Sequence, residues 1–279
     1  MAEKYEITDE GKKLVFKLKS GIKFHDGNPV TSKDVKFTLE SLANPKYEGD
    51  LASYVQSITG FKEFHEGKAT ELKGVVCPDD NTIEINFDTP YSPALINIGT
   101  LGILPAHIWG KIDIDKWGEN NGAIAKPVGS GPYKFDSFKV GEFTKLVANE
   151  EYHNGAPKIK NFVFKVVNEE TSSAELINGS IDLAELSNIK ADDAKTLNEK
   201  GIEVLKYPNS KIQYMGFNLR NKTLQDIKLR TAIAYGIDRE ALVNGLLEGN
   251  GVVINTPMVP SLWSYPITKI GRASCRERV

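Results

Sequence analysis

The sequence predicts a mixed α/β protein that contains more than one folding unit. Apolar and polar residues alternate in much of the first ninety residues, as they do in β-hairpins, whereas apolar residues recur at helical spacing from Leu224 onwards. A length of 279 residues suits one large domain or two ordinary ones. Asparagine, glycine and proline cluster between residues 120 and 132, and this shift of composition predicts a domain boundary there.

In the first half of the chain, local patterns predict two hairpins with a helix between them. The clearest element is the helix, because Thr31 stands three residues before Asp34 in a variant of the capping box and apolar residues follow at helical spacing. The predicted elements are, in order, strands at 4–8 and 14–18, the helix from Thr31 to the stop at Asn44-Pro45, a strand-like stretch at 54–88 with a hairpin around 78–81, and short helices at 94–98 and 105–109.

Strands and helices alternate in the second half. Asp238 is the expected N-cap of the last helix, and Gly249 closes it. The predicted elements are strands within 133–148 and 159–167, a helix at 171–177, a short strand at 181–183, and helices at 191–199, from Leu224 through Ile233, and from Asp238 to Leu247.

Composition excludes several classes of function. The chain has 35 Lys and Arg against 37 Asp and Glu, a net charge of −2, so it lacks the basic excess of nucleic-acid-binding proteins. Cys77 and Cys275 have no spacing that would hold zinc, and no two of the four histidines stand at i, i+4. We therefore expect no metal site, no cofactor and no nucleic-acid partner.

No catalytic residue is predicted. Gly129-Ser130-Gly131 is followed by Pro132-Tyr133 rather than by the Lys and Ser/Thr of a phosphate-binding loop, and no Gly-x-Ser-x-Gly elbow occurs. His25-Asp26 resembles a metal phosphohydrolase only as a dipeptide. Several aromatic residues at predicted element boundaries are candidates for a ligand cleft, although most are expected in the core: Trp109, Trp117, Tyr133, Tyr214, Phe217 and Trp263.

Both ends of the sequence suggest a fragment. A strand begins at about residue 5, so we expect further strands of its sheet elsewhere, some of them before Met1. Residues 267–279 are expected to be a non-native tail, because the sequence from Ile270 looks like the translation of a sequencing-library adapter. A natural basic tail is the alternative.

Motifs in a fixed order give the chain a family resemblance. It resembles the peptide/nickel-type substrate-binding proteins of ABC importers, the family 5 extracellular solute-binding proteins, over nearly all of residues 5–266. The motifs that carry the resemblance are Gly21-Ile22-Lys23-Phe24-His25-Asp26-Gly27 with Thr31-Ser32-Lys33-Asp34-Val35, Pro127-Val128-Gly129-Ser130-Gly131-Pro132-Tyr133, Asn178-Gly179-Ser180-Ile181-Asp182, and Phe217-Asn218 with Leu229-Arg230-Thr231-Ala232-Ile233-Ala234-Tyr235-Gly236-Ile237-Asp238-Arg239.

The resemblance implies the two-lobed fold of periplasmic binding proteins, of type II with an extra side domain, truncated here at both ends. It assigns residues 1–20 and 129–213 to the first lobe, 21–128 to the inserted side domain and 214–266 to the start of the second lobe. The implied protein is not an enzyme. It is a monomer exported to the periplasm or anchored outside the membrane as a lipoprotein.

The implied function is capture of a peptide between the lobes and its delivery to the permease subunits of an ABC transporter. The expected ligand-binding residues are Ser130 and Gly131 in the first lobe and Tyr214, Met215, Gly216, Phe217 and Asn218 at the lobe crossing. Nickel chelates, haem and oligosaccharides stay open as ligands, since the family carries them too. A non-functional fragment and an uncharacterised hydrolase are the alternatives from other classes.

Overall fold

The computed structural model describes residues 1–119, 122–168, 170–186, 189–207, 210–262 and 265. The chain divides into two compact units, Met1–Val166 and Val167–Val279. The boundary predicted at 120–132 lies within the first of these units.

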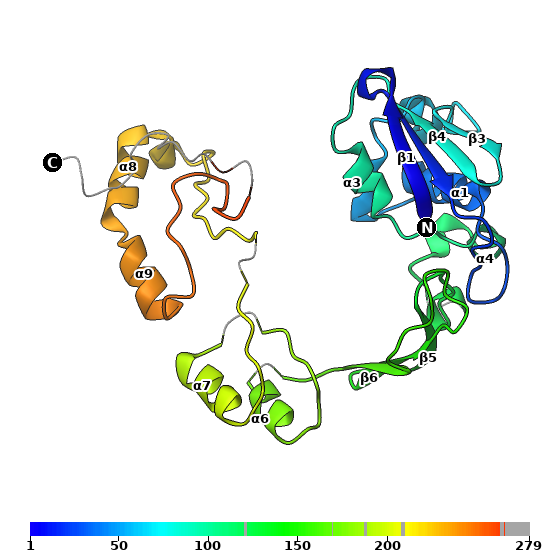
Figure 1. Ribbon diagram of the computed structural model, residues 1–279. Coiled ribbons are helices and arrows are strands. Elements are labelled where there is room, and N and C mark those ends of the chain that lie inside the picture. Colours follow the sequence, from blue (N-terminus) through cyan, green and yellow to red (C-terminus); the bar gives the residue numbers. More distant parts are fainter. Residues whose placement is uncertain (120–121, 169, 187–188, 208–209, 263–264, 266–279) are drawn as a thin grey trace. The chain divides into compact units, whose positions relative to one another are not determined.

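An antiparallel sheet of four strands forms the centre of the first unit, in the order β1-β2-β4-β3 (Figure 1). Both predicted hairpins are confirmed, and pairing of Leu14 with Ile85 and of Phe16 with Ile83 joins them into one sheet. The strands are β1 (Ala2–Thr8), β2 (Lys13–Leu18), β3 (Val75–Asp79) and β4 (Thr82–Asn86). The second hairpin therefore supplies two strands of the sheet that the first hairpin was expected to join.

Helix α1 (Ser32–Ala43) packs against this sheet and confirms the predicted helix. Val35, Leu39 and Leu42 are buried on its inner side with the apolar residues of β2 and β4. Burial of a Leu side chain contributes roughly 1.5–3 kcal/mol, so this contact stabilises the unit substantially. The sheet also crosses the domain boundary expected at residue 20, because β2 pairs with a strand of the segment 21–128.

Short helices surround this core, and one of them corrects a prediction. The strand-like stretch expected from Tyr54 contains a helix at Phe61–His65, where Gly60 adopts a left-handed φ of 81° and Phe61 and Phe64 pack on the core. Tertiary packing of two aromatic rings spaced three apart outweighs their strand propensity. The short helices are η1 (Asp9–Gly11), η2 (Asp50–Tyr54), α2 (Phe61–His65), α3 (Ala94–Gly99), α4 (Ala106–Trp109), η3 (Ile114–Lys116) and α5 (Gly122–Ala125).

A second antiparallel sheet, in the order β5-β6-β7, completes the first unit and confirms the strands predicted after residue 133. Its strands are β5 (Tyr133–Lys139), β6 (Phe143–Ala148) and β7 (Asn161–Lys165). Leu146 pairs with Phe135 on one side and with Phe162 on the other, and the rings of Tyr133 and Phe162 lie 5.7 Å apart.

The second unit is mainly helical in its described part. Asp238 caps α9 by accepting a hydrogen bond from the N–H of Ala241, as predicted. The strand predicted at 181–183 is wrong: Ser180 bonds back to Asn178 in a turn, and Leu183 is exposed with no neighbouring strand among the described residues. The helices are α6 (Ser172–Ile177), α7 (Ala191–Glu199), η4 (Lys222–Gln225), α8 (Ile227–Gly236) and α9 (Arg239–Leu246).

The expected non-native tail at 267–279 lies outside the described residues. In the part of the chain that is described, no helix is both long enough and apolar enough to span a membrane.

Candidate functional site

The turn at Gly129-Ser130-Gly131, which leads into β5, carries two of the seven predicted ligand-binding residues. His25 holds it by three hydrogen bonds across more than a hundred residues of sequence. The N–H of His25 donates to the carbonyl of Gly129 at 2.7 Å, the N–H of Gly129 donates to Nδ1 of His25 at 3.1 Å, and Nε2 of His25 lies 3.1 Å from the carbonyl oxygen of Gly131. The turn is therefore fixed to the His25-Asp26-Gly27 motif.

These contacts define the protonation state of His25. Nδ1 accepts a hydrogen bond from a backbone N–H, so it carries no proton, and Nε2–H must be the donor to Gly131. Burial lowers the pKa of His25, the hydrogen bond to Gly131 opposes this effect, and the charge of Lys134 adds to it. The ring is neutral, and both its nitrogens are occupied by backbone groups.

Asn149, which directly follows β6, also holds this turn, through the carbonyl groups of Gly131 and Pro132. Its side chain is 4% exposed, and its Nδ2 donates to the carbonyl of Gly131 at 3.2 Å. Its own N–H donates to the carbonyl of Pro132 at 2.8 Å, and its Oδ1 accepts from the N–H of Glu151. A buried amide with its polar atoms satisfied in this way is a rigid anchor.

Among the described residues, no activating base lies beside the Ser130 hydroxyl. Both nitrogens of His25 are used by Gly129 and Gly131, and Ser130 Oγ contacts Sδ of Met1 at 3.7 Å. A serine nucleophile needs an imidazole or amine that can take its proton. His25 therefore cannot serve Ser130 as a base in this arrangement.

The remaining predicted residues, Tyr214 to Asn218, lie in the second unit in a stretch without regular secondary structure. Tyr214 is 87% exposed and Met215 is 58% exposed, while Phe217 is half-buried. Asn218 is a turn residue, because its Oδ1 accepts from the N–H of Arg220. From Tyr214 to Phe217, no backbone group is hydrogen-bonded to another described backbone group.

The two groups of predicted residues thus occur in different units, Ser130 and Gly131 in residues 1–166 and the other five in residues 167–279. Ser130 and Gly131 lie in a turn that hydrogen bonds from His25 and Asn149 fix. In the second group, the apolar side chains of Tyr214 and Met215 are exposed, on backbone without regular secondary structure. Asn149 is a site residue that sequence analysis did not single out, since an asparagine after a strand is a common turn signal and its burial cannot be seen in the sequence.

The other aromatic candidates are mostly structural. Trp109 and Trp117 pack edge to face at 4.9 Å, and Trp117 also lies 6.3 Å from Phe37. The Tyr133 hydroxyl donates to the carbonyl of Ile159. Trp263 lies outside the described residues.

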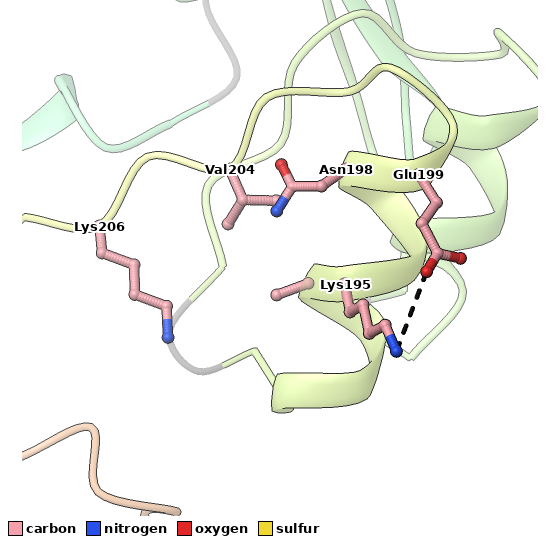
Figure 2. Close-up of a pocket in the computed structure, with 6 residues that line it drawn as sticks. Lys195, Asn198, Glu199, Val204 and Lys206 are labelled. Atoms are coloured by element: carbon pink, nitrogen blue, oxygen red, sulfur yellow. Dashed lines mark ion pairs between the residues drawn. The ribbon is translucent and has the colours of Figure 1, made fainter.

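A surface hollow of about 820 Å³ lies beside α7 (Figure 2). Lys195 and Asn198 on the helix and Val204 and Lys206 on the following segment line it. Lys195 lies 4.0 Å from Glu199, and Lys206 donates to Asn250, so both ammonium groups have partners. The described residues contain no group of three His, Cys, Asp or Glu side chains that could hold a metal ion.

Comparisons with known proteins identify relatives for nearly the whole chain. A family model described as bacterial extracellular solute-binding proteins, family 5 Middle, matches residues 1–273. The oligopeptide-binding protein AppA of Bacillus subtilis is 32% identical over 271 residues, which are 95% of this chain and 46% of AppA. Heme-binding protein A of Haemophilus influenzae is 28% identical over 273 residues, which are 95% of this chain and 49% of that protein.

Solved structures give the same result. AppA from Bacillus subtilis in complex with a nonapeptide matches with a TM-score of 0.74 and 30% identity, covering 95% of this chain and 50% of AppA. NikZ from Campylobacter jejuni in complex with Ni(L-His) matches with a TM-score of 0.70 and 27% identity, over 92% of this chain and 48% of NikZ. The predicted fold class is confirmed, and the chain spans about half the length of these relatives. The chain belongs to the bacterial extracellular solute-binding proteins of family 5.

Proposed function

We propose that this chain is part of the substrate-binding component of an ABC importer, which captures peptides and delivers them to a membrane permease without chemical change. The observation that carries the proposal is the stretch Tyr214–Phe217, whose backbone groups have no described backbone partner and in which the side chains of Tyr214 and Met215 are exposed. An extended peptide can hydrogen-bond to such a backbone as an added strand, while the exposed side chains form tolerant contacts. The likeness to AppA in complex with a nonapeptide supports this choice of ligand.

The lobe assignment is part of the proposal. We place residues 129–213 in the first lobe and residues from 214 onwards at the start of the second. Because β1 and β2 share a sheet with β3 and β4, we now assign residues 1–20 to the side domain together with 21–128. Ser130 and Gly131 would then contact the ligand from the first lobe and Tyr214 to Asn218 from the crossing.

The proposed setting is extracytoplasmic, as the family description states for its members. We further propose a monomer that is free in the periplasm or anchored by a lipid and that docks on permease subunits after binding its ligand. The absence of a base beside Ser130 agrees with transport rather than hydrolysis.

Titration calorimetry tests the ligand class. The 279-residue chain and the protein encoded by the intact locus are titrated with peptides of two to nine residues, with haemin, with the nickel–histidine complex and with a maltooligosaccharide. We expect saturable binding of peptides by the protein of the intact locus, weaker binding by the 279-residue chain, and intact peptides by mass spectrometry afterwards. Tighter binding of haemin, chelate or sugar than of any peptide would overturn the ligand class, and peptide cleavage would overturn the transport function.

A further inference from the structure

His25 lies in a motif whose side chains are rigidly held. Gly27 adopts a φ of 91°, which closes the tight turn in which the N–H of Phe24 donates to the carbonyl of Asn28. Ile22, Phe24 and Val30 on either side of the turn form a small buried cluster. The backbone that carries His25 is therefore held in place, so the imidazole cannot follow the 129–131 turn if that turn moves.

Asp26, next to His25, does not compete for this imidazole. Its carboxylate accepts from Nε2 of His107 at 2.6 Å and from the N–H of Asn28 at 3.1 Å. Two charged groups act on His25 electrostatically: Lys134 on β5 disfavours the protonated ring, and Asp26 favours it more weakly. His107 on α4, which faces Asp26, is the remaining titratable group at this contact.

Protonation of His25 is incompatible with the observed bonds. A proton on Nδ1 would place two donors, Nδ1–H and the N–H of Gly129, face to face at a separation of 3.1 Å. The Nε2–H bond to Gly131 would survive, as would the bond from Asn149 to the same carbonyl. Acid would therefore release one side of the turn, at Gly129, and leave the other side held.

We propose that His25 is a positioning residue that holds the Gly129-Ser130-Gly131 turn in its ligand-binding conformation only while the imidazole is neutral, with Asn149 as the anchor that does not titrate. This inference rests on the proposed function, because it assigns the turn to ligand contact. It links cargo affinity to pH: the turn is fully held above the ordinary pKa of histidine, and this hold is lost as pH falls through the lowered pKa of His25 in the folded chain. The sign follows from burial, which lowers the pKa of His25 in the folded chain.

Nuclear magnetic resonance tests the hydrogen bonds without any ligand. In the 279-residue chain labelled with nitrogen-15, we expect Nδ1 of His25 to resonate as an unprotonated ring nitrogen at pH 7.5 and to show scalar coupling to the amide nitrogen of Gly129. The amide signals of Gly129 and Ser130 should shift as pH is lowered to 5, and in His25→Asn they should not. A protonated Nδ1 at pH 7.5, or equal shifts in His25→Asn, would overturn the proposal.

Calorimetry with a nonapeptide tests the consequence for binding, using the protein encoded by the intact locus. His25→Asn keeps an acceptor for Gly129, so we expect partial rescue relative to His25→Ala, whose affinity should fall roughly five- to tenfold at pH 7.5 for the hydrogen bonds lost. Affinity of the unmodified protein should fall between pH 7.5 and 5, and affinity of His25→Asn should be flat. His153→Gln is the matched control and should keep the pH dependence.

The two measurements separate the two proposals. If the resonances titrate as expected but no peptide binds at any pH, the proposed function fails and the role of His25 in holding the turn stands. If peptide binds with the same pH dependence in His25→Asn as in the unmodified protein, the positioning role fails and the proposed function stands.

Discussion

Asp34 offers a direct test of what the motif Thr31-Ser32-Lys33-Asp34-Val35, which carries part of the family resemblance, does in the fold. Its side chain is 6% exposed, and its Oδ2 accepts hydrogen bonds from the N–H and the hydroxyl of Thr31, both at 2.9 Å. Its Oδ1 accepts from the N–H of Ala106 at 3.1 Å, and α4 begins at that residue. One carboxylate therefore caps α1 and fixes α4 to it.

Removal of this carboxylate should be costly. Loss of a helix cap costs about 1 kcal/mol. Loss of a hydrogen bond that a backbone N–H donates to a charged carboxylate costs about 1.5–3 kcal/mol. We expect Asp34→Ala to lower the free energy of unfolding of the first unit by about 3 kcal/mol. Asp34→Asn keeps one acceptor but turns a donor toward Thr31 or Ala106, so about 1–2 kcal/mol is expected.

Tryptophan fluorescence during urea unfolding measures this effect, because Trp109 belongs to α4 and packs on Trp117. The experiment uses a Trp263→Phe background, so that only these two residues report. Glu66→Ala, which removes an exposed ion pair with Lys68, is the control and should change stability by less than about 0.5 kcal/mol. If Asp34→Ala costs less than about 1 kcal/mol, or no more than Asp34→Asn, the assignment of Asp34 as a structural clamp is wrong.

Four further outcomes are expected. Gly131→Ala adds a methyl group that meets nothing within 4 Å, so the urea midpoint should not change, whereas nonapeptide affinity in calorimetry should fall if the position faces ligand. Tyr214→Ala should lower that affinity about tenfold with no loss of stability, since the ring is exposed in this chain. Burial raises the pKa of Glu40, so the stability contributed by its neutral form is present at low pH and is lost as pH rises through the raised pKa. Glu40→Gln keeps the hydrogen bond that the N–H of Leu72 donates to this side chain. The variant should therefore raise the unfolding free energy at pH 7 by less than about 1 kcal/mol and should give no gain at pH 4. Leu246 is 71% exposed at the end of α9, so Leu246→Lys should leave both the helix content by circular dichroism and the thermal midpoint unchanged; a lower midpoint would show that the side chain is buried.

Elements that depend on local patterns could be predicted from the sequence. The capping residues Thr31, Asp34 and Asp238 gave the starts of their helices because a cap acts within four residues. The hairpins followed from alternation and turn residues in the same way.

Elements that depend on distant partners could not be predicted. Phe61 and Phe64 are helical because the core of the first sheet receives their rings, and that core is assembled from residues far away in sequence. The pairing of β2 with β4 is equally non-local, and it joins strands from the two sides of the boundary that the resemblance placed at residue 20. The role of His25 was missed because its partners, Gly129 and Gly131, are more than a hundred residues away.

The first two motifs of the family resemblance, at residues 21–27 and 31–35, indicate the family more clearly than they indicate a ligand, and their hydrogen bonds explain why. The polar atoms of His25, Asp26 and Asp34 are used within the chain, on the 129–131 turn, on His107 and on α4. A side chain committed in this way has little capacity left for a cargo molecule. This agrees with the variety of ligands among the relatives: AppA is found in complex with a nonapeptide, NikZ is found in complex with Ni(L-His), and a third relative is named heme-binding protein A. We propose that the choice among such ligands lies in side chains that have no partner within the fold, and in this chain the exposed Tyr214 and Met215 meet that condition.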